Sequence, residues 1–263
     1  MKKTYKVLVT GVAGFIGSKV CEELQRKKFS IIGVDDLSSG KKRNIPKNIT
    51  FFNFDLSNYQ NFRKLPKCKF ILHLAGQSSG DISFDNPIAD LKKNTQSTLN
   101  LIKFGIKSKT KKIIYASSMS VYGDINKKKY DENMQPQPKS CYGVSKLASE
   151  NYLKIFSKKV NYINFRMFNV YGPGQDLSNL RQGMVSIFLA QAIKNKRIKV
   201  KGSLNRIRDF IYIDDVVKIW VKSLNDKIYN QTINLSSGEP ISVKKLLNEI
   251  KILLPGTKII KAS

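Results

Sequence analysis

The sequence has 263 residues, which is enough chain for one or two domains with a sizeable hydrophobic core. It contains no apolar run of the roughly 18 residues that a membrane-spanning helix needs, so no membrane partner is expected. The formal net charge of +28 invites a nucleic-acid function, but only eight of the 47 basic residues are arginine, and the lysines are scattered. Since no basic strand interleaved with aromatic residues appears, we expect no specific binding of nucleic acid.

The cysteines Cys21, Cys68 and Cys141 lack the spacing of a metal or redox site, so no metal is predicted. Free thiols suit a reducing compartment. The residues Met1–Lys3 lead directly into the first predicted strand, which leaves no room for a signal peptide. We therefore expect a cytoplasmic protein.

The first predicted elements are a buried strand over Val7–Thr10 and a helix over Phe15–Leu24, joined by a glycine-rich turn. Gly11, Gly14 and Gly17 have the spacing of a dinucleotide-binding turn. The missing side chains allow a tight turn, a close approach of backbone N–H groups to a pyrophosphate, and close packing of the helix on the strand. The helix N-terminus would present free N–H groups and a positive dipole end to the phosphates. An ordinary glycine-containing turn is the alternative.

The second predicted strand, Ile31–Val34, ends at Asp35 and Asp36, and Asp35 lies 18 residues after Gly17. A carboxylate at this place can hydrogen-bond the ribose hydroxyls of an adenosine. It would also repel a 2′-phosphate. The pattern therefore favours NAD over NADP, although the basic residues at 41–43 weaken that preference.

Strand and helix patterns alternate along the following chain. Further strands are predicted at Thr50–Phe54, Phe70–Leu74, Lys112–Ser117 and Tyr162–Phe168, and helices at Pro87–Ile106 and Tyr142–Phe156. Such alternation is typical of a parallel sheet that is covered by helices on both faces. The expected fold class is α/β, a Rossmann-like doubly wound parallel sheet.

The residues with catalytic chemistry follow the strand Lys112–Ser117. Tyr142 and Lys146 are four residues apart, so they share one face of the next predicted helix. A lysine ammonium beside a tyrosine lowers the pKa of the phenol and can make it a proton acceptor. A surface pair of the same spacing is the alternative. We interpret His73, which follows an apolar strand, as structural, and Cys141 as a neighbour of the site.

Motifs along essentially the whole chain have the order of one known family. They are Thr10-Gly11-x-x-Gly14-x-x-Gly17, Val34-Asp35-Asp36-Leu37-Ser38-Ser39-Gly40, Asp55-Leu56, His73-Leu74-Ala75-Gly76, Asn94, Ser117-Ser118, Tyr142-x-x-x-Lys146, Arg166–Gly174 and Arg208–Asp215. In these the sequence resembles the extended short-chain dehydrogenase/reductase superfamily, in its NAD-dependent epimerase/dehydratase family.

The resemblance implies a site for NAD and a catalytic group of Ser118, Tyr142 and Lys146, with Tyr142 as proton acceptor. The residues implied to bind the cofactor are Gly11, Gly14, Phe15, Ile16, Gly17, Asp35, Asp36, Leu37, Ser38, Ser39, Gly40, Asp55, Leu56, Leu74, Ala75, Gly76, Gln77, Asn94, Ser117, Tyr142, Lys146 and Phe168. Those implied to bind a nucleotide-sugar substrate are Ser78, Ser118, Asn169 and Arg208, since the Arg208 guanidinium suits a diphosphate.

Within the family, one short stretch separates the chemistries. Dehydratases and decarboxylases of this type carry an acidic residue after the serine, because elimination and decarboxylation need a further acid or base. Met119 and Ser120 stand there in this sequence, and the pattern is similar to that of UDP-hexose 4-epimerases. The implied activity is 4-epimerisation of a UDP-hexose through a transient 4-keto sugar. A dehydratase, decarboxylase or reductase, or a truncated NAD-binding protein without activity, is the alternative.

The resemblance also implies two domains and a homodimer. The NAD-binding domain is expected at residues 1–171 and 210–237, and a smaller, interleaved substrate-binding domain at residues 172–209 and 238–263. The helices 87–106 and 142–156 are expected to pair with their copies in a second subunit, with Ile102, Phe104 and Phe156 as apolar contacts. Family members usually run some fifty or more residues past the stretch Val243–Leu254, whereas this sequence stops at Ser263, so a substrate-binding part is expected to be missing.

Overall fold

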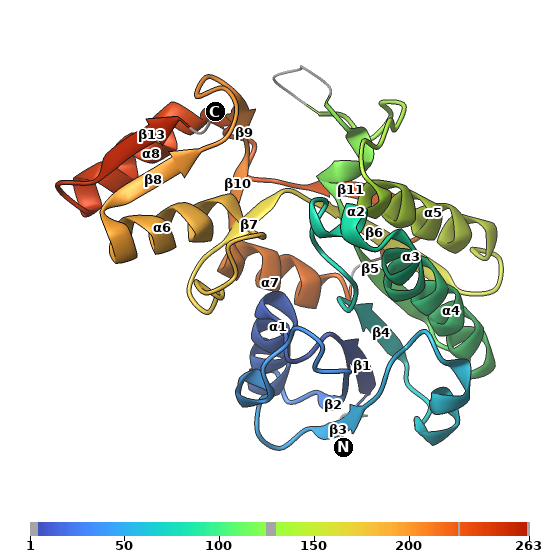
Figure 1. The fold of residues 1–263 in the computed structure, drawn as a ribbon. Coiled ribbons are helices and arrows are strands. Elements are labelled where there is room, and N and C mark those ends of the chain that lie inside the picture. Colours follow the sequence, from blue (N-terminus) through green and yellow to red (C-terminus); the bar gives the residue numbers. More distant parts are fainter. Residues whose placement is uncertain (1–4, 125–129, 226, 262–263) are drawn as a thin grey trace.

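The central element of the fold is a seven-stranded sheet in which all the strands are parallel (Figure 1). The computed structural model describes residues 5–124, 130–225 and 227–261, so the expectation about Met1–Lys3 lies outside it. The strand order is β11-β6-β5-β4-β1-β2-β3. The strands are β1 (Lys6–Thr10), β2 (Ser30–Asp35), β3 (Thr50–Asn53), β4 (Phe70–His73), β5 (Lys112–Ser118), β6 (Asn161–Met167) and β11 (Gln231–Leu235).

Two hydrophobic cores lie on the two faces of this sheet, because successive strand residues point to opposite sides. Val7 and Val9 of β1 belong to the core beneath α1 (Phe15–Arg26) and α7 (Ile213–Lys222). Leu8, between them, belongs to the core beneath the helices on the other face. Those helices are α4 (Ser97–Lys107) and α5 (Cys141–Ile155). The predicted fold class, a doubly wound α/β sheet, is confirmed.

The predicted helix over 87–106 is helical throughout but contains an irregular turn. It consists of α3 (Pro87–Leu91), a π-helical turn η3 (Lys92–Gln96) and α4. At this turn the hydroxyls of Ser97 and Thr98 donate to the backbone carbonyls of Lys93 and Asn94. The spacing of apolar residues carries no information about such polar contacts, so it did not predict the π-helical turn. The short helix α2 (Ile82–Asp85) precedes this segment.

A second lobe has its own hydrophobic core and lies apart from the large sheet (Figure 1). It contains α6 (Met184–Asn195), α8 (Val243–Leu253) and the parallel pair of β8 (Arg197–Val200) with β13 (Lys258–Lys261). The remaining short elements are β7 (Asn169–Tyr171), β9 (Ile207–Arg208), β10 (Phe210–Tyr212), β12 (Ile241–Ser242), η1 (Lys42–Asn44), η2 (Tyr59–Lys64) and η4 (Met119–Tyr122). In the described part of the chain, no helix has the length and apolar character that crossing a membrane requires.

Two residues chosen as dimer contacts lie in the wrong place. Ile102 and Phe104 are buried in the core between α4 and the sheet. An amphipathic helix pattern identifies the apolar face but not the element that covers it. The large apolar side chains exposed on α3 and α5 are instead Ile88, Leu91, Val144 and Ile155.

Candidate cofactor and catalytic site

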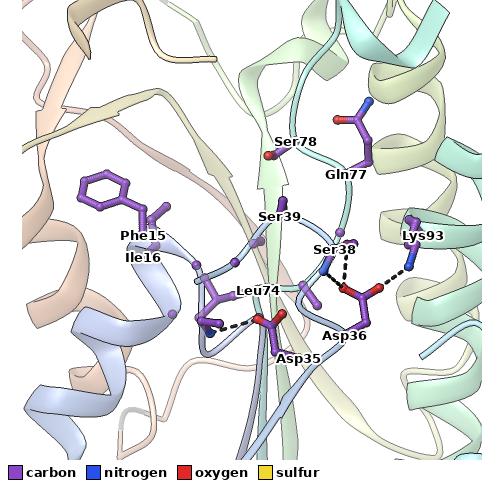
Figure 2. A pocket seen from close by; sticks show the side chains of 18 of the residues that line it. Phe15, Ile16, Asp35, Asp36, Ser38, Ser39, Leu74, Gln77, Ser78 and Lys93 are labelled. Atoms are coloured by element: carbon purple, nitrogen blue, oxygen red, sulfur yellow. Dashed lines mark hydrogen bonds and ion pairs between the residues drawn. The ribbon is translucent and has the colours of Figure 1, made fainter. Parts of the chain in front are cut away.

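A cavity of about 500 Å³ opens beyond the carboxyl ends of β1 and β4. The strand order reverses between these two strands, since the chain runs from β1 outward to β2 and β3 and then returns to β4 on the other side. Such a switch point is where open α/β sheets bind ligands. The cavity is lined by the β1–α1 turn, the ends of β2, β3 and β4, and the start of α5. Figure 2 shows the β1–α1 turn, the end of β2 and the segment that follows β4.

The glycine turn at one wall of the cavity depends on missing side chains. Gly11 has φ of +74°, and a Cβ on it would lie 2.8 Å from the backbone nitrogen of Ala75. A Cβ on Gly17 would overlap the carbonyl oxygen of Gly11. Gly14 begins α1 with no side-chain cap, and no acidic residue stands in the first turn. The first N–H groups of α1 are therefore available to an anion in the cavity.

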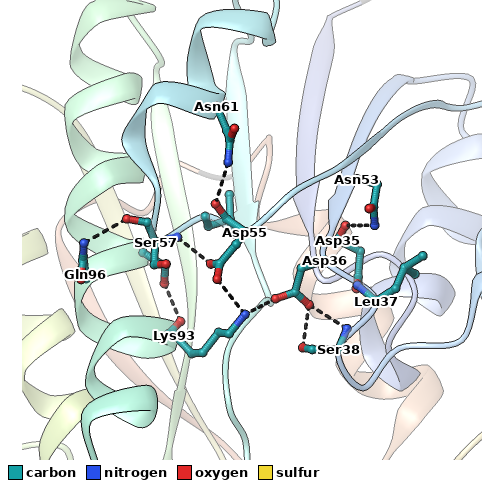
Figure 3. A network of polar contacts seen from close by, with 12 residues as sticks. Asp35, Asp36, Leu37, Ser38, Asn53, Asp55, Ser57, Asn61, Lys93 and Gln96 are labelled. Carbon is teal, nitrogen blue, oxygen red and sulfur yellow. Dashed lines mark hydrogen bonds and ion pairs between the residues drawn. The ribbon is translucent and has the colours of Figure 1, made fainter.

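Three carboxylates and one lysine form the far end of the cavity (Figure 3). Asp35 accepts hydrogen bonds from the backbone N–H groups of Ala13 (2.9 Å) and Leu37 (2.8 Å), and its burial raises the pKa of its carboxyl. Asp36 and Asp55 both form ion pairs with Lys93, which comes from η3. The sequence offered no signal for Lys93, because its partners lie far away along the chain.

Ser118, Tyr142 and Lys146 come together where β5 meets the start of α5. Ser118 ends β5; its hydroxyl donates to Ser120 Oγ (3.2 Å), accepts from the Ser120 N–H (3.1 Å), and lies near enough to Tyr142 to affect the pKa of the phenol. A Cβ on Gly143 would lie 2.7 Å from the carbonyl oxygen of Ser120, so a glycine there lets α5 approach η4 closely. Lys146 Nζ donates to the carbonyl of Ala116 at 2.9 Å and lies 5.5 Å from the centre of the Tyr142 ring. Tyr142 and Lys146 both line the cavity.

Burial dominates the electrostatics of this group. It raises the pKa of Tyr142 to about 12, with Asp90 adding to the rise and the Ser118 hydrogen bond opposing it. It lowers the pKa of Lys146 to about 8, against the carboxylates of Asp90 and Glu150. Sequence reasoning expects the Lys146 ammonium and the positive charge of a nicotinamide to lower the Tyr142 pKa together, and desolvation opposes that lowering. Ionisation of Tyr142 needs a further positive charge in the cavity.

A buried ion pair supports the catalytic helix from behind. Arg166 of β6 and Glu150 of α5 are paired at 2.7 Å, with side chains that are 7% and 4% exposed. Arg166 also donates to the Tyr122 hydroxyl at 2.9 Å. The hydroxyl of Ser117 donates to Glu150 rather than facing the cavity. Sequence reasoning used Arg166 only as part of a motif and missed Glu150, although Glu150 stands one helical turn after Lys146.

His73 supports the cavity from within the core. Its ring nitrogens hydrogen-bond the hydroxyls of Thr10 (2.9 Å) and Thr98 (3.1 Å), and burial lowers its pKa to about 3. The Thr10 hydroxyl in turn accepts from the N–H groups of Leu74 and Ala75, which fixes the turn after β4. This geometry agrees with a structural role.

Comparison with known proteins decides the family. The sequence profile of the NAD dependent epimerase/dehydratase family matches residues 7–236. The chain belongs to this family. It is 35% identical to a putative UDP-glucose 4-epimerase of Methanocaldococcus jannaschii over 93% of this chain and 81% of that protein. It is 31% identical to UDP-glucuronic acid decarboxylase 1 of Xenopus tropicalis over 96% of this chain and 61% of that protein.

Solved structures of the family share the fold. A UDP-glucose 4-epimerase of Thermotoga maritima, solved with UDP-glucose, superposes with a TM-score of 0.93 at 32% identity, covering 98% of this chain and 85% of that one. A UDP-glucose 4-epimerase of Thermus thermophilus, solved with NAD, has a TM-score of 0.87 at 28% identity, covering 98% and 90%. NAD is the cofactor of this family.

The residues of the cavity fit a dinucleotide. The uncapped start of α1 suits the pyrophosphate, and the carboxylate end suits a ribose. Behind this wall, the buried Oδ1 of Asn94 has no hydrogen-bond partner among the described residues and faces Gly76, which lines the cavity.

Most of the predicted cofactor residues line the cavity. The lining residues among them are Gly11, Gly14, Phe15, Ile16, Gly17, Asp35, Asp36, Ser38, Ser39, Gly40, Asp55, Leu56, Leu74, Ala75, Gly76, Gln77, Tyr142 and Lys146. Leu37, Asn94, Ser117 and Phe168 do not belong to this lining, and the last three are buried. Of the predicted substrate residues, only Ser78 belongs to it, because the Asn169 amide is directed to the carbonyl of Asp209 (2.7 Å) and Arg208 to that of Ile207 (2.8 Å).

Residues 174–183 form a segment, here called the bridging segment, that joins both sides of the cavity. Asp176 pairs with Lys41 at 2.8 Å on the β2 side. Arg181 pairs with Asp81 at 2.9 Å and with Asp85 at 2.7 Å on the other side. Several residues of the bridging segment line the cavity, so it acts as a roof. The sequence did not predict it.

Proposed function

We propose that the chain is an NAD-dependent nucleotide-sugar 4-epimerase that acts on a UDP-hexose. The observation that carries the proposal is the position of Tyr142 in the cavity wall, with Ser118 beside it at the end of β5 and Met119 and Ser120 following Ser118 along the chain. Neither of these two following side chains is an acid or base suited to elimination or decarboxylation. The names of the Methanocaldococcus and Thermotoga relatives support the same activity.

In the proposed reaction, the Tyr142 phenolate accepts the proton of the sugar 4-hydroxyl and later returns it. The Ser118 hydroxyl donates a hydrogen bond to the same oxygen. Lys146 holds a ribose hydroxyl of the cofactor and adds positive charge near Tyr142. When bound, NAD supplies hydride transfer, taking a hydride from C4 and giving it back to the opposite face of the 4-keto sugar.

We also propose that the two parts of the chain bind different ligands. Residues 1–171 and 210–237 would bind NAD, and residues 172–209 and 238–263 would bind the nucleotide-sugar. The pairing of β11 with β6 and the separate core of the second lobe support this division. Asn169 and Arg208, which stand between the two parts on β7 and β9, would bind the nucleotide diphosphate once they turn from their backbone partners.

The test is product analysis with Tyr142→Phe. Wild-type protein is incubated with UDP-glucose, UDP-N-acetylglucosamine and UDP-glucuronate, and products are identified by NMR. We expect the 4-epimer of one of these, and a rate at least ~10²-fold lower for Tyr142→Phe, as is usual when a general base is lost. Tyr152→Phe, on the same helix but packed against the core, is the matched control.

Three outcomes contradict the proposal. Loss of water or CO₂ from the sugar, or net consumption of NADH, would assign a dehydratase, decarboxylase or reductase. Retention of most activity in Tyr142→Phe would exclude the tyrosine as base. Tight NAD binding without turnover of any substrate would indicate a binding protein.

A further inference from the structure

Lys93 is a cavity residue that neither the motifs nor the proposed reaction uses. It stands in the π-helical turn η3, and its ammonium reaches two carboxylates that end two different strands (Figure 3). It bonds Asp36, which follows β2, and lies 3.0 Å from Oδ2 of Asp55, which follows β3. Lys93 therefore joins the ends of two strands to a helix across the far end of the cavity.

The two carboxylates are oriented by donors on both of their oxygens. Oδ1 of Asp36 accepts from the N–H (2.9 Å) and hydroxyl (2.6 Å) of Ser38, and Oδ1 of Asp55 accepts from the N–H of Ser57 (2.8 Å). The Lys93 ammonium donates to Oδ2 of Asp36 and to Oδ2 of Asp55. The contacts lower the pKa of both carboxyls and raise the pKa of Lys93, so all three groups are charged at neutral pH.

This end of the cavity is where the adenosine half of the cofactor belongs. The N-terminus of α1 fixes the place of the pyrophosphate. Asp36 and Asp55 follow β2 and β3 on one side of β1, whereas Tyr142 and Lys146 lie near the end of β5 on its other side. Because the Lys93 ammonium contacts both carboxylates, it sets the distance between Asp36 and Asp55 and offsets the repulsion between their negative charges. Because the Lys93 ammonium is paired with two carboxylates, it is not available to pair with a phosphate group.

We propose that Lys93 is a cofactor-positioning residue that sets both the affinity for NAD and the discrimination against NADP. Its ammonium holds the strand ends around the adenosine ribose, and the carboxylates of Asp36 and Asp55 keep that ammonium away from a 2′-phosphate. Freed from them, Lys93 becomes a partner for the 2′-phosphate of NADP. The inference rests on the family's cofactor and on its placement here, not on the sugar reaction, so nucleotide binding tests it separately.

The experiment measures the competition of NAD and NADP for the purified 263-residue chain by equilibrium dialysis. For Lys93→Met we expect NAD to bind about tenfold more weakly, which corresponds to ~1.4 kcal/mol. Lys93→Arg should retain most of the affinity, because a guanidinium can also bridge two carboxylates. Lys92→Met is the matched control, because the side chain of Lys92, the residue before Lys93, is exposed. This variant should bind NAD as the wild type does.

The decisive variant is Asp36→Asn combined with Asp55→Asn. We expect it to bind NADP at least tenfold more tightly than the wild type does, and adding Lys93→Met should remove that gain. A purely structural Lys93 would weaken NAD and NADP by equal factors in every background, which would overturn the proposal. It would also be overturned if NADP binding by the Asn variants did not depend on Lys93. Thermal unfolding of each variant identifies any variant that fails to fold. If Lys93→Met fails to fold, the comparison of NAD and NADP affinities is made with Lys93→Arg instead.

Discussion

The buried ammonium of Lys146 should give the protein a measurable dependence of stability on pH. The side chain is almost completely enclosed, and burial lowers its pKa from 10.5 to about 8. In the unfolded chain the ammonium is in water and keeps its ordinary pKa. Between pH 8 and 10.5 the unfolded state therefore binds one more proton than the folded state at this position.

The sign follows from proton linkage. Because the unfolded state binds more protons in this window, the free energy of unfolding rises with pH, by ~1.4 kcal/mol per pH unit. Over the whole window the contribution of Lys146 amounts to about 3 kcal/mol. Cys21 and Cys68 act in the opposite direction above pH 9, since burial raises the pKa of their thiols to about 12 and about 11.

A difference measurement isolates Lys146 from these other groups. Urea unfolding of nucleotide-free protein is followed by circular dichroism from pH 7 to 10, for the wild type and for Lys146→Met. We expect the stability of the wild type minus that of the variant to rise with pH above 8. Lys154→Met, an exposed position on the same helix, is the matched control. A difference that stays constant from pH 7 to 10 would refute the reasoning.

Two further predictions concern the support of the catalytic helix and the assembly. Glu150→Gln leaves the Arg166 charge buried without its partner and should lower the free energy of unfolding by ~3–5 kcal/mol, measured by urea unfolding. A cost below about 1 kcal/mol would show that the pair is not what stabilises this region. We also expect a homodimer through the exposed apolar side chains of α3 and α5, so that Leu91→Glu with Val144→Glu gives monomers in light scattering. A wild-type protein that is monomeric at micromolar concentration would contradict it.

The parts of the fold that the sequence could predict depend on local patterns. The turn with Gly11, Gly14 and Gly17 was recognisable because its geometry excludes side chains within one short segment. The strands appeared as short apolar runs, with ends correct to within one or two residues. Tyr142 and Lys146 share a helix face because of their spacing alone.

The parts that could not be predicted depend on partners distant in the sequence. Lys93 meets Asp36 and Asp55, which are 57 and 38 residues away, and no pattern along the chain marks such a pair. The high pKa of Tyr142 arises from burial, which several elements create together.

The cavity has a roof, formed by the bridging segment, and a floor, formed by the sheet, and the two are held in place by interactions of different strength. The floor is the buried carboxyl edge of a seven-stranded sheet. The roof is fastened by ion pairs whose side chains are well exposed, 46% for Arg181 and 40% for Asp176. Such pairs contribute little individually and weaken with salt. We therefore expect a rise in ionic strength to loosen the roof more than the floor and to shorten the residence time of a bound nucleotide.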